Sequence, residues 1–210
     1  TATIVYDRYV WTNPDNSTQI IYIKPGSTPA NGNRANEYSP AGQGTSTGYY
    51  WRKYFDPTSV SNGFQSGLNL ILIRYADVLL MYAEAKQALG QMDATVWDKT
   101  IRALRQRAGF TAATALDFPG AGAGLTNVIR RERRSELAME GRRIDDIRRW
   151  RIAEIVLNDW ANGARFGDPT VDNGYLRVQL RTFNPAKNYL WPLPASELAL
   201  NTNLRQNPNY

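Results

Sequence analysis

Two stretches of helical periodicity, joined by a connection of only three residues, place the strongest constraint on how this chain folds. Across residues 70–89, apolar side chains recur at steps of three or four, and Gly90 provides a natural stop. The second stretch begins at Asp93, a suitable N-cap, and ends at Gly109. A connection as short as Gly90-Gln91-Met92 requires antiparallel helices, so the sequence predicts a helical hairpin.

The same periodicity predicts which side chains of the hairpin are buried. In the first helix the apolar face consists of Ile71, Tyr75, Val78, Tyr82, Ala85 and Leu89, widened by Leu72, Ala76, Leu79 and Ala83. In the second helix the inward residues are Val96, Trp97, Ile101, Leu104 and Ala108. A hairpin of about 40 residues is close to the unit of helical-repeat (TPR-like) proteins, in which stacked hairpins bury a shared core.

A third helix is predicted from about Thr126 to Arg151. Gly141 interrupts it, where glycine costs roughly 1 kcal/mol relative to alanine. Close packing against another element is the favoured explanation, and a local kink is the alternative. A short helix around Ile152–Ala161 and a single turn at Ser196–Leu200 complete the helical prediction.

The first third of the chain has a different character. Thr3–Tyr6 and Gln19–Lys24 are rich in β-branched and aromatic residues, which favours short strands. Turn-forming sequences such as Asn13-Pro14-Asp15-Asn16 and Asn31-Gly32-Asn33 follow one another here. The predicted fold is mostly α, with helical-hairpin (TPR-like) packing, long irregular loops and a few short strands in the N-terminal third. Residues 1–67 form the irregular region and residues 68–210 the helical region of one structural unit.

The composition contains neither cysteine nor histidine, and this restricts the chemistry. Disulfides, thiolate metal sites, Ser-His and Cys-His catalysis and the commonest zinc ligand are all excluded. Carboxylate chemistry and oxygen-ligated cations remain open. We expect no cofactor and no bound metal.

Residues 130–151 hold nine arginines against five acidic residues, within a chain of net charge +6. A phosphate-contacting helix is one interpretation. An ion-pair lattice is favoured, because Glu132, Glu136 and Glu140 form a carboxylate row that a nucleic-acid helix would not carry. The lattice pairs expected from spacing are Arg133–Glu136, Arg142–Asp146 and Asp145–Arg149.

The carboxylate row is the one enzyme-like feature of the sequence. Glu132 and Glu136 could lie about 5–10 Å apart, as the acid and base of a glycosidase do. However, the flanking arginines would lower both pKa values, whereas a catalytic acid needs a raised one. The sequence therefore predicts a protein that is not an enzyme and does not bind nucleic acid.

Aromatic residues are dense in the N-terminal third, and four of them are candidates for ligand contact. Aromatic faces on loops can stack on the apolar faces of sugar rings. Tyr49-Tyr50-Trp51, directly after Gly48, is the best cluster, and Trp11 is the fourth candidate. The competing interpretation, which we favour, is that these rings supply the core that loops otherwise lack.

Four segments, in order along the chain, resemble the SusD/RagB family of Bacteroidetes outer-membrane nutrient-binding lipoproteins. They are Ile73-Arg74-Tyr75-Ala76-Asp77-Val78-Leu79-Leu80-Met81-Tyr82-Ala83-Glu84-Ala85, then Ile101-Arg102 with Arg105-Gln106-Arg107-Ala108-Gly109, then residues 130–150 beginning Arg130-Arg131-Glu132-Arg133-Arg134-Ser135-Glu136-Leu137, and finally Tyr189-Leu190-Trp191-Pro192-Leu193-Pro194 with Gln206-Asn207-Pro208-Asn209-Tyr210. The resemblance covers about residues 70–210.

The resemblance implies a surface-exposed protein, held at the outer membrane by a lipid anchor outside this chain, that passes glycans to a TonB-dependent (SusC-like) transporter. The chain starts at Thr1 and is expected to be the C-terminal portion of a longer protein. No ligand residue transfers by motif. The matching residues Arg74, Glu84, Arg133, Glu136, Arg142 and Asp145 are expected to be structural framework. Two alternatives stay open: a scaffold that docks on the transporter while the ligand site lies elsewhere, and capture of peptides instead of glycans.

Overall fold

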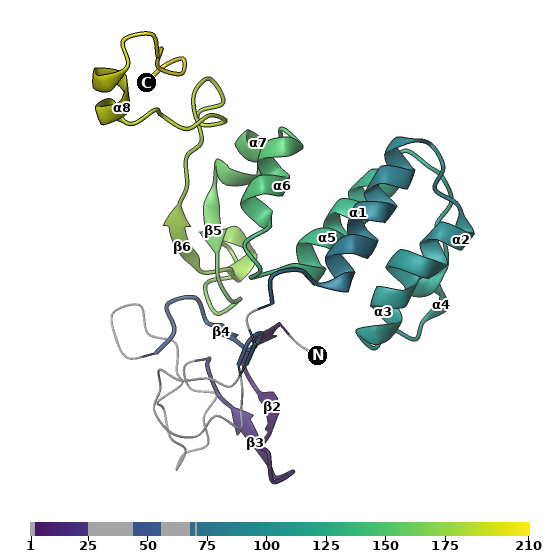
Figure 1. The fold of residues 1–210 in the computed structure, drawn as a ribbon. Helices are drawn as coiled ribbons and strands as arrows, with labels where there is room; N and C mark the ends of the chain where they lie inside the picture. The colour runs from purple at the N-terminus through teal and green to yellow at the C-terminus, as the bar shows by residue number, and fades with distance from the viewer. Residues whose placement is uncertain (1–2, 25–43, 56–67, 70) are drawn as a thin grey trace. The chain divides into compact units, whose positions relative to one another are not determined.

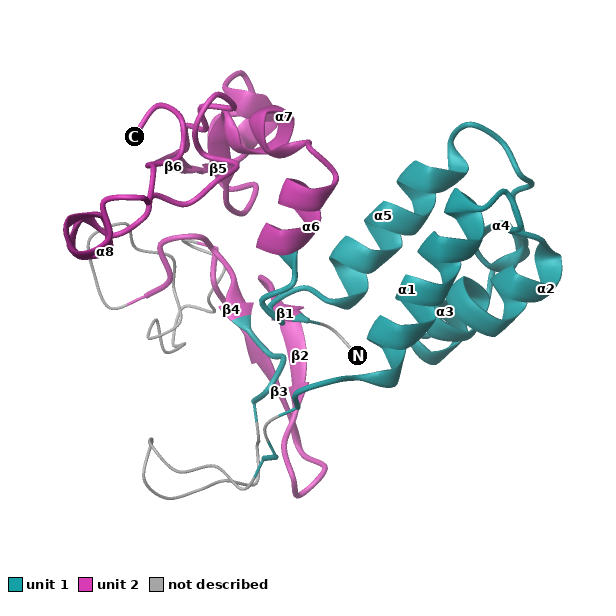
Figure 2. Cartoon of the chain, turned by 45° about the horizontal axis from the view of Figure 1, so that its top comes forward, with its two compact units in different colours: residues 1–3, 51–143 teal, residues 4–50, 144–210 magenta. Residues whose placement is uncertain are grey.

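The structure of the chain is a computed structural model that describes residues 3–24, 44–55, 68–69 and 71–210 (Figure 1). The chain divides into two compact units (Figure 2). Unit 1 consists of residues 1–3 and 51–143, and unit 2 of residues 4–50 and 144–210. The predicted division at residue 67 falls outside the described residues and stays a prediction, as does the turn at Asn31-Gly32-Asn33.

Unit 1 contains the predicted hairpin. Its first helix, α1, spans Tyr75–Ala88, and its second arm consists of α2 (Ala94–Trp97), a π-helical segment η1 (Asp98–Arg102) and α3 (Ala103–Arg107). The Asp93 carboxylate accepts a hydrogen bond from the Val96 amide at 2.8 Å, which confirms the predicted N-cap. The prediction that α1 begins near residue 70 was wrong, because residues 71–74 are not helical and Arg74 has an extended backbone.

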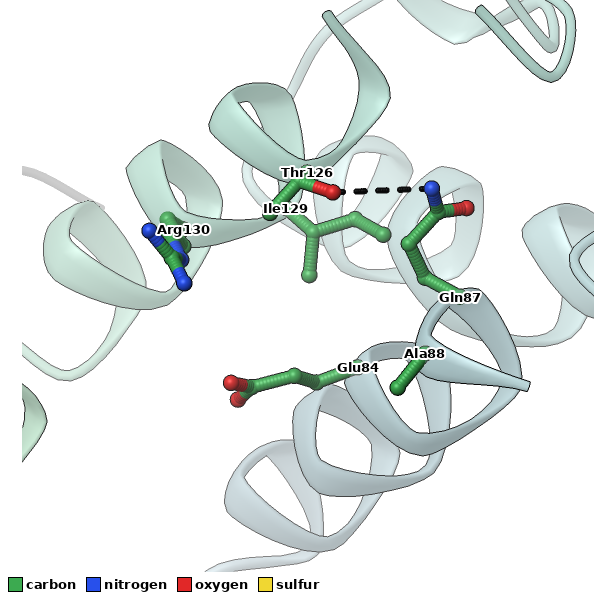
Figure 3. A pocket seen from close by; sticks show the side chains of 6 residues that line it. All are labelled: Glu84, Gln87, Ala88, Thr126, Ile129 and Arg130. Carbon is green, nitrogen blue, oxygen red and sulfur yellow. Dashed lines mark hydrogen bonds between the residues drawn. The ribbon is translucent and has the colours of Figure 1, made fainter. Parts of the chain in front are cut away.

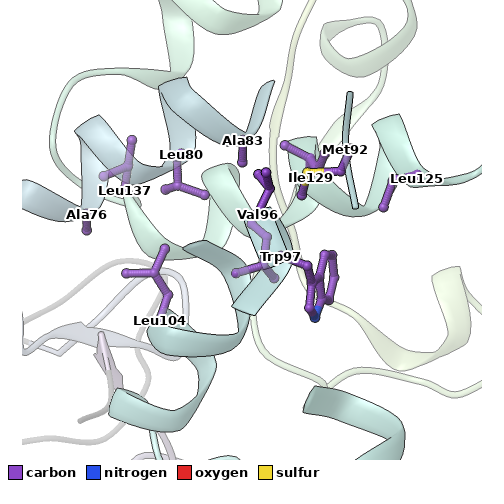
Figure 4. Close-up of a cluster of buried hydrophobic side chains, with 11 residues drawn as sticks. Ala76, Leu80, Ala83, Met92, Val96, Trp97, Leu104, Leu125, Ile129 and Leu137 are labelled. Atoms are coloured by element: carbon purple, nitrogen blue, oxygen red, sulfur yellow. The ribbon is translucent and has the colours of Figure 1, made fainter. Parts of the chain in front are cut away.

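The core of unit 1 lies where α1 packs against the second arm and against α5 (Leu125–Glu136), with the short α4 (Ala113–Leu116) alongside α3 (Figure 4). Trp97 is fully buried, and its indole Nε1 donates a hydrogen bond to the Leu116 carbonyl at 2.7 Å. The buried cluster consists of Ala76, Leu80, Ala83, Met92, Val96, Trp97, Ile101, Leu104, Leu125, Ile129 and Leu137. The second arm therefore buries the residues that its periodicity predicts, apart from Ala108, which is exposed.

For α1 the predicted buried face was right in part. Ala76 and Ala83 are buried as predicted, but Leu80, which was not predicted, is also buried, and Tyr75 and Leu89 are 75% and 68% exposed. The physical reason is that α1 is apolar on both sides, so its periodicity does not determine which side meets the core. The small side chains of Ala76 and Ala83 permit close approach of the neighbouring helices, and the bulky residues stand on the opposite side. We call Tyr75, Val78, Tyr82 and Leu89 the outer stripe of α1.

The predicted single helix over residues 126–151 is two helices, α5 and α6 (Arg143–Arg149). Between them Met139 and Gly141 adopt positive φ angles of 64° and 76°, in the left-handed region that ends a right-handed helix. A Cβ built on Gly141 would meet nothing within 4 Å. Close packing was therefore the wrong explanation of Gly141, and a local break in the helix is the right one.

Unit 2 is built from short elements around a small set of buried side chains. Strand β1 is Ile4–Val5, and β4 (Tyr50–Trp51) lies at the boundary of the two units. Strands β2 (Tyr9–Thr12) and β3 (Thr18–Ile21) form an antiparallel hairpin, and the predicted turn at residues 13–16 connects them. The second half of the unit comprises α6, α7 (Ala153–Leu157), β5 (Trp160–Asn162), η2 (Asp172–Gly174), β6 (Arg177–Leu180) and α8 (Ala195–Leu200).

The mostly helical fold with a few short strands confirms the predicted fold class. The antiparallel pair of β5 and β6, with Trp160 opposite Leu180, lies outside the N-terminal third and was not predicted. Among the described residues, no helix combines the length and the apolar character needed to cross a bilayer.

Candidate functional site

The β2–β3 hairpin carries a row of aromatic side chains that includes one of the predicted ligand residues. Tyr9 and Trp11 are two positions apart on β2, so their side chains lie on the same face of the strand. Their ring centroids are 6.4 Å apart, and Tyr6 packs edge-on against Tyr9 at 5.4 Å. The rings of Tyr9 and Trp11 are half-buried, so each keeps part of its surface open to a ligand. We call these three residues the aromatic row.

The other predicted ligand residues follow a loop that is held closely in place. Gly48 has φ of +77°, and a Cβ built there would lie 2.5 Å from the Cβ of Ala164. The Thr45 hydroxyl donates a hydrogen bond to the Tyr49 carbonyl at 2.8 Å. Tyr49 and Tyr50 are half-buried, whereas the Trp51 side chain is 72% exposed.

The four predicted ligand residues do not form one cluster within a single unit. Trp11, Tyr49 and Tyr50 belong to unit 2, and Trp51 belongs to unit 1. Tyr6 and Tyr9 join Trp11 in the row but were not among the predicted site residues. The alternation of Tyr9 and Trp11 across Val10 is a strand pattern in the sequence that could have identified Tyr9.

Four of the six predicted framework residues, Arg74, Arg133, Glu136 and Arg142, take part in a cluster of ion pairs between the α1 segment and the α5 segment of the chain. Arg74 Nη2 lies 2.8 Å from Glu136 Oε1 and 2.7 Å from Glu140 Oε1. Arg133 Nη1 lies 2.6 Å from Asp77 Oδ1, and both residues are at least nine-tenths buried. Arg142 Nε approaches the same carboxylate at 3.4 Å. These contacts therefore connect elements far apart in the sequence, whereas the spacing argument paired residues within one helix.

Glu140 is the acid on which two cations converge, since it also forms an ion pair with Lys53. Burial of Glu140 raises the pKa of its carboxyl. Hydrogen bonds from Arg74 and Lys53, together with their positive charges, lower the pKa by more than burial raises it, so the pKa lies below its ordinary value. The pKa of Arg74 is raised: burial lowers it, and the bonds to Glu140 and Glu136 outweigh burial. Both groups stay charged at neutral pH.

Spacing suggested that Arg149 pairs with Asp145, but in the structure Arg149 pairs with Asp146. Asp145 is exposed on α6, while Asp146 is buried and accepts hydrogen bonds from Arg149 Nε and Nη2 at 3.0 and 2.9 Å.

The carboxylates considered for glycosidase chemistry are both bound by arginines. Arg105 donates to Glu132 Oε2 from Nε at 2.9 Å and from Nη2 at 2.8 Å, and Arg107 Nη2 donates to Glu136 at 2.7 Å. Both carboxylates are therefore held in charge-assisted hydrogen bonds, and their side chains are only 15% and 11% exposed, which leaves little of either open to a sugar. Within the described part of the chain, no group of acidic side chains has the arrangement of a metal site.

A pocket of about 110 Å³ lies between α1 and α5 (Figure 3). Its lining residues are Glu84, Gln87, Ala88, Thr126, Ile129 and Arg130. The Glu84 carboxylate points from α1 toward Arg130 on α5, the arginine-rich helix (Figure 3). Glu84, expected to be framework, therefore also borders a cavity.

Comparison with known proteins identifies the class. The whole chain, residues 1–210, matches the SusD family, so the chain belongs to this family, as the four resembling segments indicated. It is 36% identical, over 71% of its length, to SusD-like protein P2 of Formosa agariphila. A crystal structure of a SusD-like carbohydrate binding protein from Bacteroides fragilis matches 97% of the chain with a TM-score of 0.74 and 33% identity. A second SusD-like protein from the same species matches 99% with a TM-score of 0.70 and 28% identity.

The matches cover much less of the relatives than of this chain. The chain spans 28% of the Formosa protein and 40% and 37% of the two Bacteroides structures. The portion shared with the two Bacteroides structures is nearly the whole of this chain.

Proposed function

We propose that this chain is part of a non-catalytic glycan-binding protein that acts in nutrient uptake at the outer-membrane surface. The observation that carries the proposal is membership of the SusD family, together with 33% identity to a structure described as a carbohydrate binding protein. By the same family relation, a lipid anchor outside this chain would hold the protein at the surface, and a SusC-like TonB-dependent transporter would receive the glycan.

The aromatic row is the part of this chain best suited to contact the glycan. Half-exposed tyrosine and tryptophan rings offer apolar faces to the C–H faces of sugar rings, and their polar atoms take part in hydrogen bonds. Trp11 has the largest ring of the row and leads the candidates. Tyr49 and Tyr50 lie in the same unit, directly after Gly48, whose backbone lies close to Ala164.

Native affinity electrophoresis of the 210-residue chain, through gels that contain different polysaccharides, tests this proposal. We expect one polysaccharide to retard the chain, and Trp11→Ala to remove most of the retardation. Trp191→Ala is the matched control, because Trp191 is an exposed tryptophan (71%) outside the row. Retardation of both variants like the unaltered chain would remove the row from the site. No retardation by any polysaccharide, with retardation by peptide ligands, would favour peptide capture.

The second candidate function is a scaffold that docks on the transporter while the ligand binds elsewhere in the full-length protein. The outer stripe of α1 favours it, since exposed contiguous apolar surface marks interaction sites. Copurification of the transporter with this chain, lost in Tyr75→Ser/Leu89→Ser but retained in Trp11→Ala, would support docking through the stripe. Copurification that survives the double substitution would place docking elsewhere.

A further inference from the structure

We propose that the pocket between α1 and α5 is a second binding site, which takes a vicinal diol from a small polyol or from the terminal ring of a sugar chain. The site lies in unit 1, whereas the aromatic row lies in unit 2. The ligand class is inferred from the side chains that line the pocket and does not depend on the proposed function.

The lining offers hydrogen-bonding groups of complementary kinds. Glu84 supplies a carboxylate that only accepts, and Arg130 a guanidinium that only donates. Gln87 and Thr126 supply an amide and a hydroxyl that do both. Each hydroxyl of a diol both donates and accepts, so two adjacent hydroxyls can bond to Gln87 and Thr126, while Glu84 and Arg130, which have contacts of their own, border the site as charged groups. One acid and one base add no net charge, which favours a neutral ligand over an anion or a cation.

Within the part of the chain that the structure describes, the side chains of Gln87 and Thr126 form only one long hydrogen bond, with each other. Gln87 Nε2 and Thr126 Oγ1 are 3.5 Å apart, at the long limit of a hydrogen bond and well beyond the common distance of about 2.9 Å (Figure 3). Among the described residues, neither side chain has another hydrogen-bonding partner. A ligand hydroxyl between them could bond to both at shorter distances.

The remaining lining and the size of the pocket fit the same class of ligand. Ala88, which is exposed, gives the lining an apolar part, and Ile129 also borders the pocket but is only 1% exposed and belongs to the core cluster of unit 1. The carbon-bound hydrogens of a polyol can pack against this apolar part while its hydroxyls face the polar groups. A cavity of about 150 Å³ holds one benzene molecule. A pocket of about 110 Å³ therefore admits glycerol or one edge of a sugar ring, but not a complete oligosaccharide.

The test is an NMR titration of the isotope-labelled 210-residue chain with glycerol and, separately, with a methyl hexopyranoside. We expect saturable shifts of the Gln87 side-chain amide and of the Thr126 backbone amide. Thr126→Val keeps the shape of the side chain and removes its hydroxyl, and Gln87→Leu removes the amide. Each should weaken binding about tenfold, as the loss of a hydrogen bond to a bound hydroxyl does. Gln91→Leu, outside the pocket, is the matched control and should bind as the unaltered chain does.

The two probes separate the sources of the diol. Saturation by the glycoside, with displacement of glycerol, assigns the pocket to the end of a sugar chain, and saturation by glycerol alone assigns it to a free polyol. Non-saturating shifts with both probes would overturn the proposal. So would Thr126→Val and Gln87→Leu variants that bind the probes with the same affinity as the unaltered chain. Thr126→Val in polysaccharide gels separates this proposal from the proposed function. Glycan binding by the aromatic row predicts that the variant is still retarded, whether or not the pocket binds a diol.

Discussion

The two units of the chain use arginine in different ways. In unit 1 arginines bind carboxylates across helices, as Arg133 binds Asp77 and Arg105 binds Glu132. In unit 2 they more often lie over aromatic rings: Arg148 is 4.7 Å from the centroid of Trp191, and Arg151 is 4.5 Å from that of Tyr189. Unit 2 also has ion pairs, such as Arg149 with Asp146, and in unit 1 Arg105 lies over Trp97.

The difference teaches that an arginine-rich composition need not indicate a single function. A guanidinium can form two parallel hydrogen bonds with a carboxylate, and its flat face can stack on an aromatic ring. The first use fixes helices that share a core, and the second covers rings in a unit with few buried aliphatic side chains. The two uses should respond differently to substitution and to pH.

The largest effect is expected for Arg133→Met in unit 1. It leaves the buried Asp77 carboxylate without its closest cation and should destabilise the chain by about 3–5 kcal/mol. Urea unfolding followed by circular dichroism measures the change. Arg134→Met, on an exposed position of the same helix, is the control and should cost less than about 0.5 kcal/mol. Addition of Asp77→Leu to Arg133→Met should recover most of the loss, and a double variant no more stable than the single one would contradict the ion-pair explanation.

Two glycines with nearly the same φ sharpen the comparison at the level of the backbone. Gly48→Ala in unit 2 adds a clash with Ala164 to the left-handed strain and should cost about 3 kcal/mol. Gly141→Ala in unit 1 meets open space and should cost about 1 kcal/mol, from strain alone. Thermal unfolding of both variants measures the difference. Equal costs would mean that the contact between Gly48 and Ala164 relaxes freely.

Acid should weaken unit 1 through Glu140. Because its folded pKa lies below the ordinary 4.5, its ion pairs contribute stability that is complete above the unfolded pKa and is lost as the pH falls through the folded pKa. Glu140→Gln should therefore cost about 1–2 kcal/mol at pH 7 and progressively less below pH 4.5. Hydrogen exchange of α5 amides as a function of pH follows this unit alone. A gap between variant and unaltered chain that stays constant down to pH 3 would refute the assignment to Glu140.

The smallest effect is expected for Arg151→Met in unit 2. Loss of the cation over the Tyr189 ring should cost about 0.5–1 kcal/mol. Hydrogen exchange of α7 amides should increase accordingly, while that of α1 amides stays unchanged. Arg131→Met, on an exposed position of α5, serves as the control for removal of one positive charge. An effect as large as that of Arg133→Met would remove the distinction between the two units.

Sequence reasoning succeeded where local chemistry determines the structure. Asp93 and Gly90 marked the ends of the helices correctly, because capping depends on a few neighbouring residues. The loss of the helix between α5 and α6 was visible at Gly141, but its cause was misjudged, since glycine serves both close packing and left-handed turns.

It failed where the outcome depends on distant parts of the chain. The buried side of α1 could not be determined, because Tyr75 and Ala76 are equally consistent with an apolar face. The partner of Arg133 is Asp77, 56 positions away, whereas spacing rules reach only three or four residues along one helix. Of the candidate site, Trp11 was identified from composition, but its association with Tyr6 and Tyr9 was not, because β2 was not among the predicted strands.

The outer stripe of α1 gives the isolated chain a surfactant character. Tyr75, Val78, Tyr82 and Leu89 are 75%, 43%, 45% and 68% exposed, so α1 presents apolar side chains to water on the side away from the core. A molecule with such a face lowers its free energy by adsorbing at an air–water boundary, with the stripe toward the gas phase. In a thin aqueous film the chain would thus concentrate at the surfaces and adopt a preferred orientation, and a trace of non-ionic detergent would return it to the bulk.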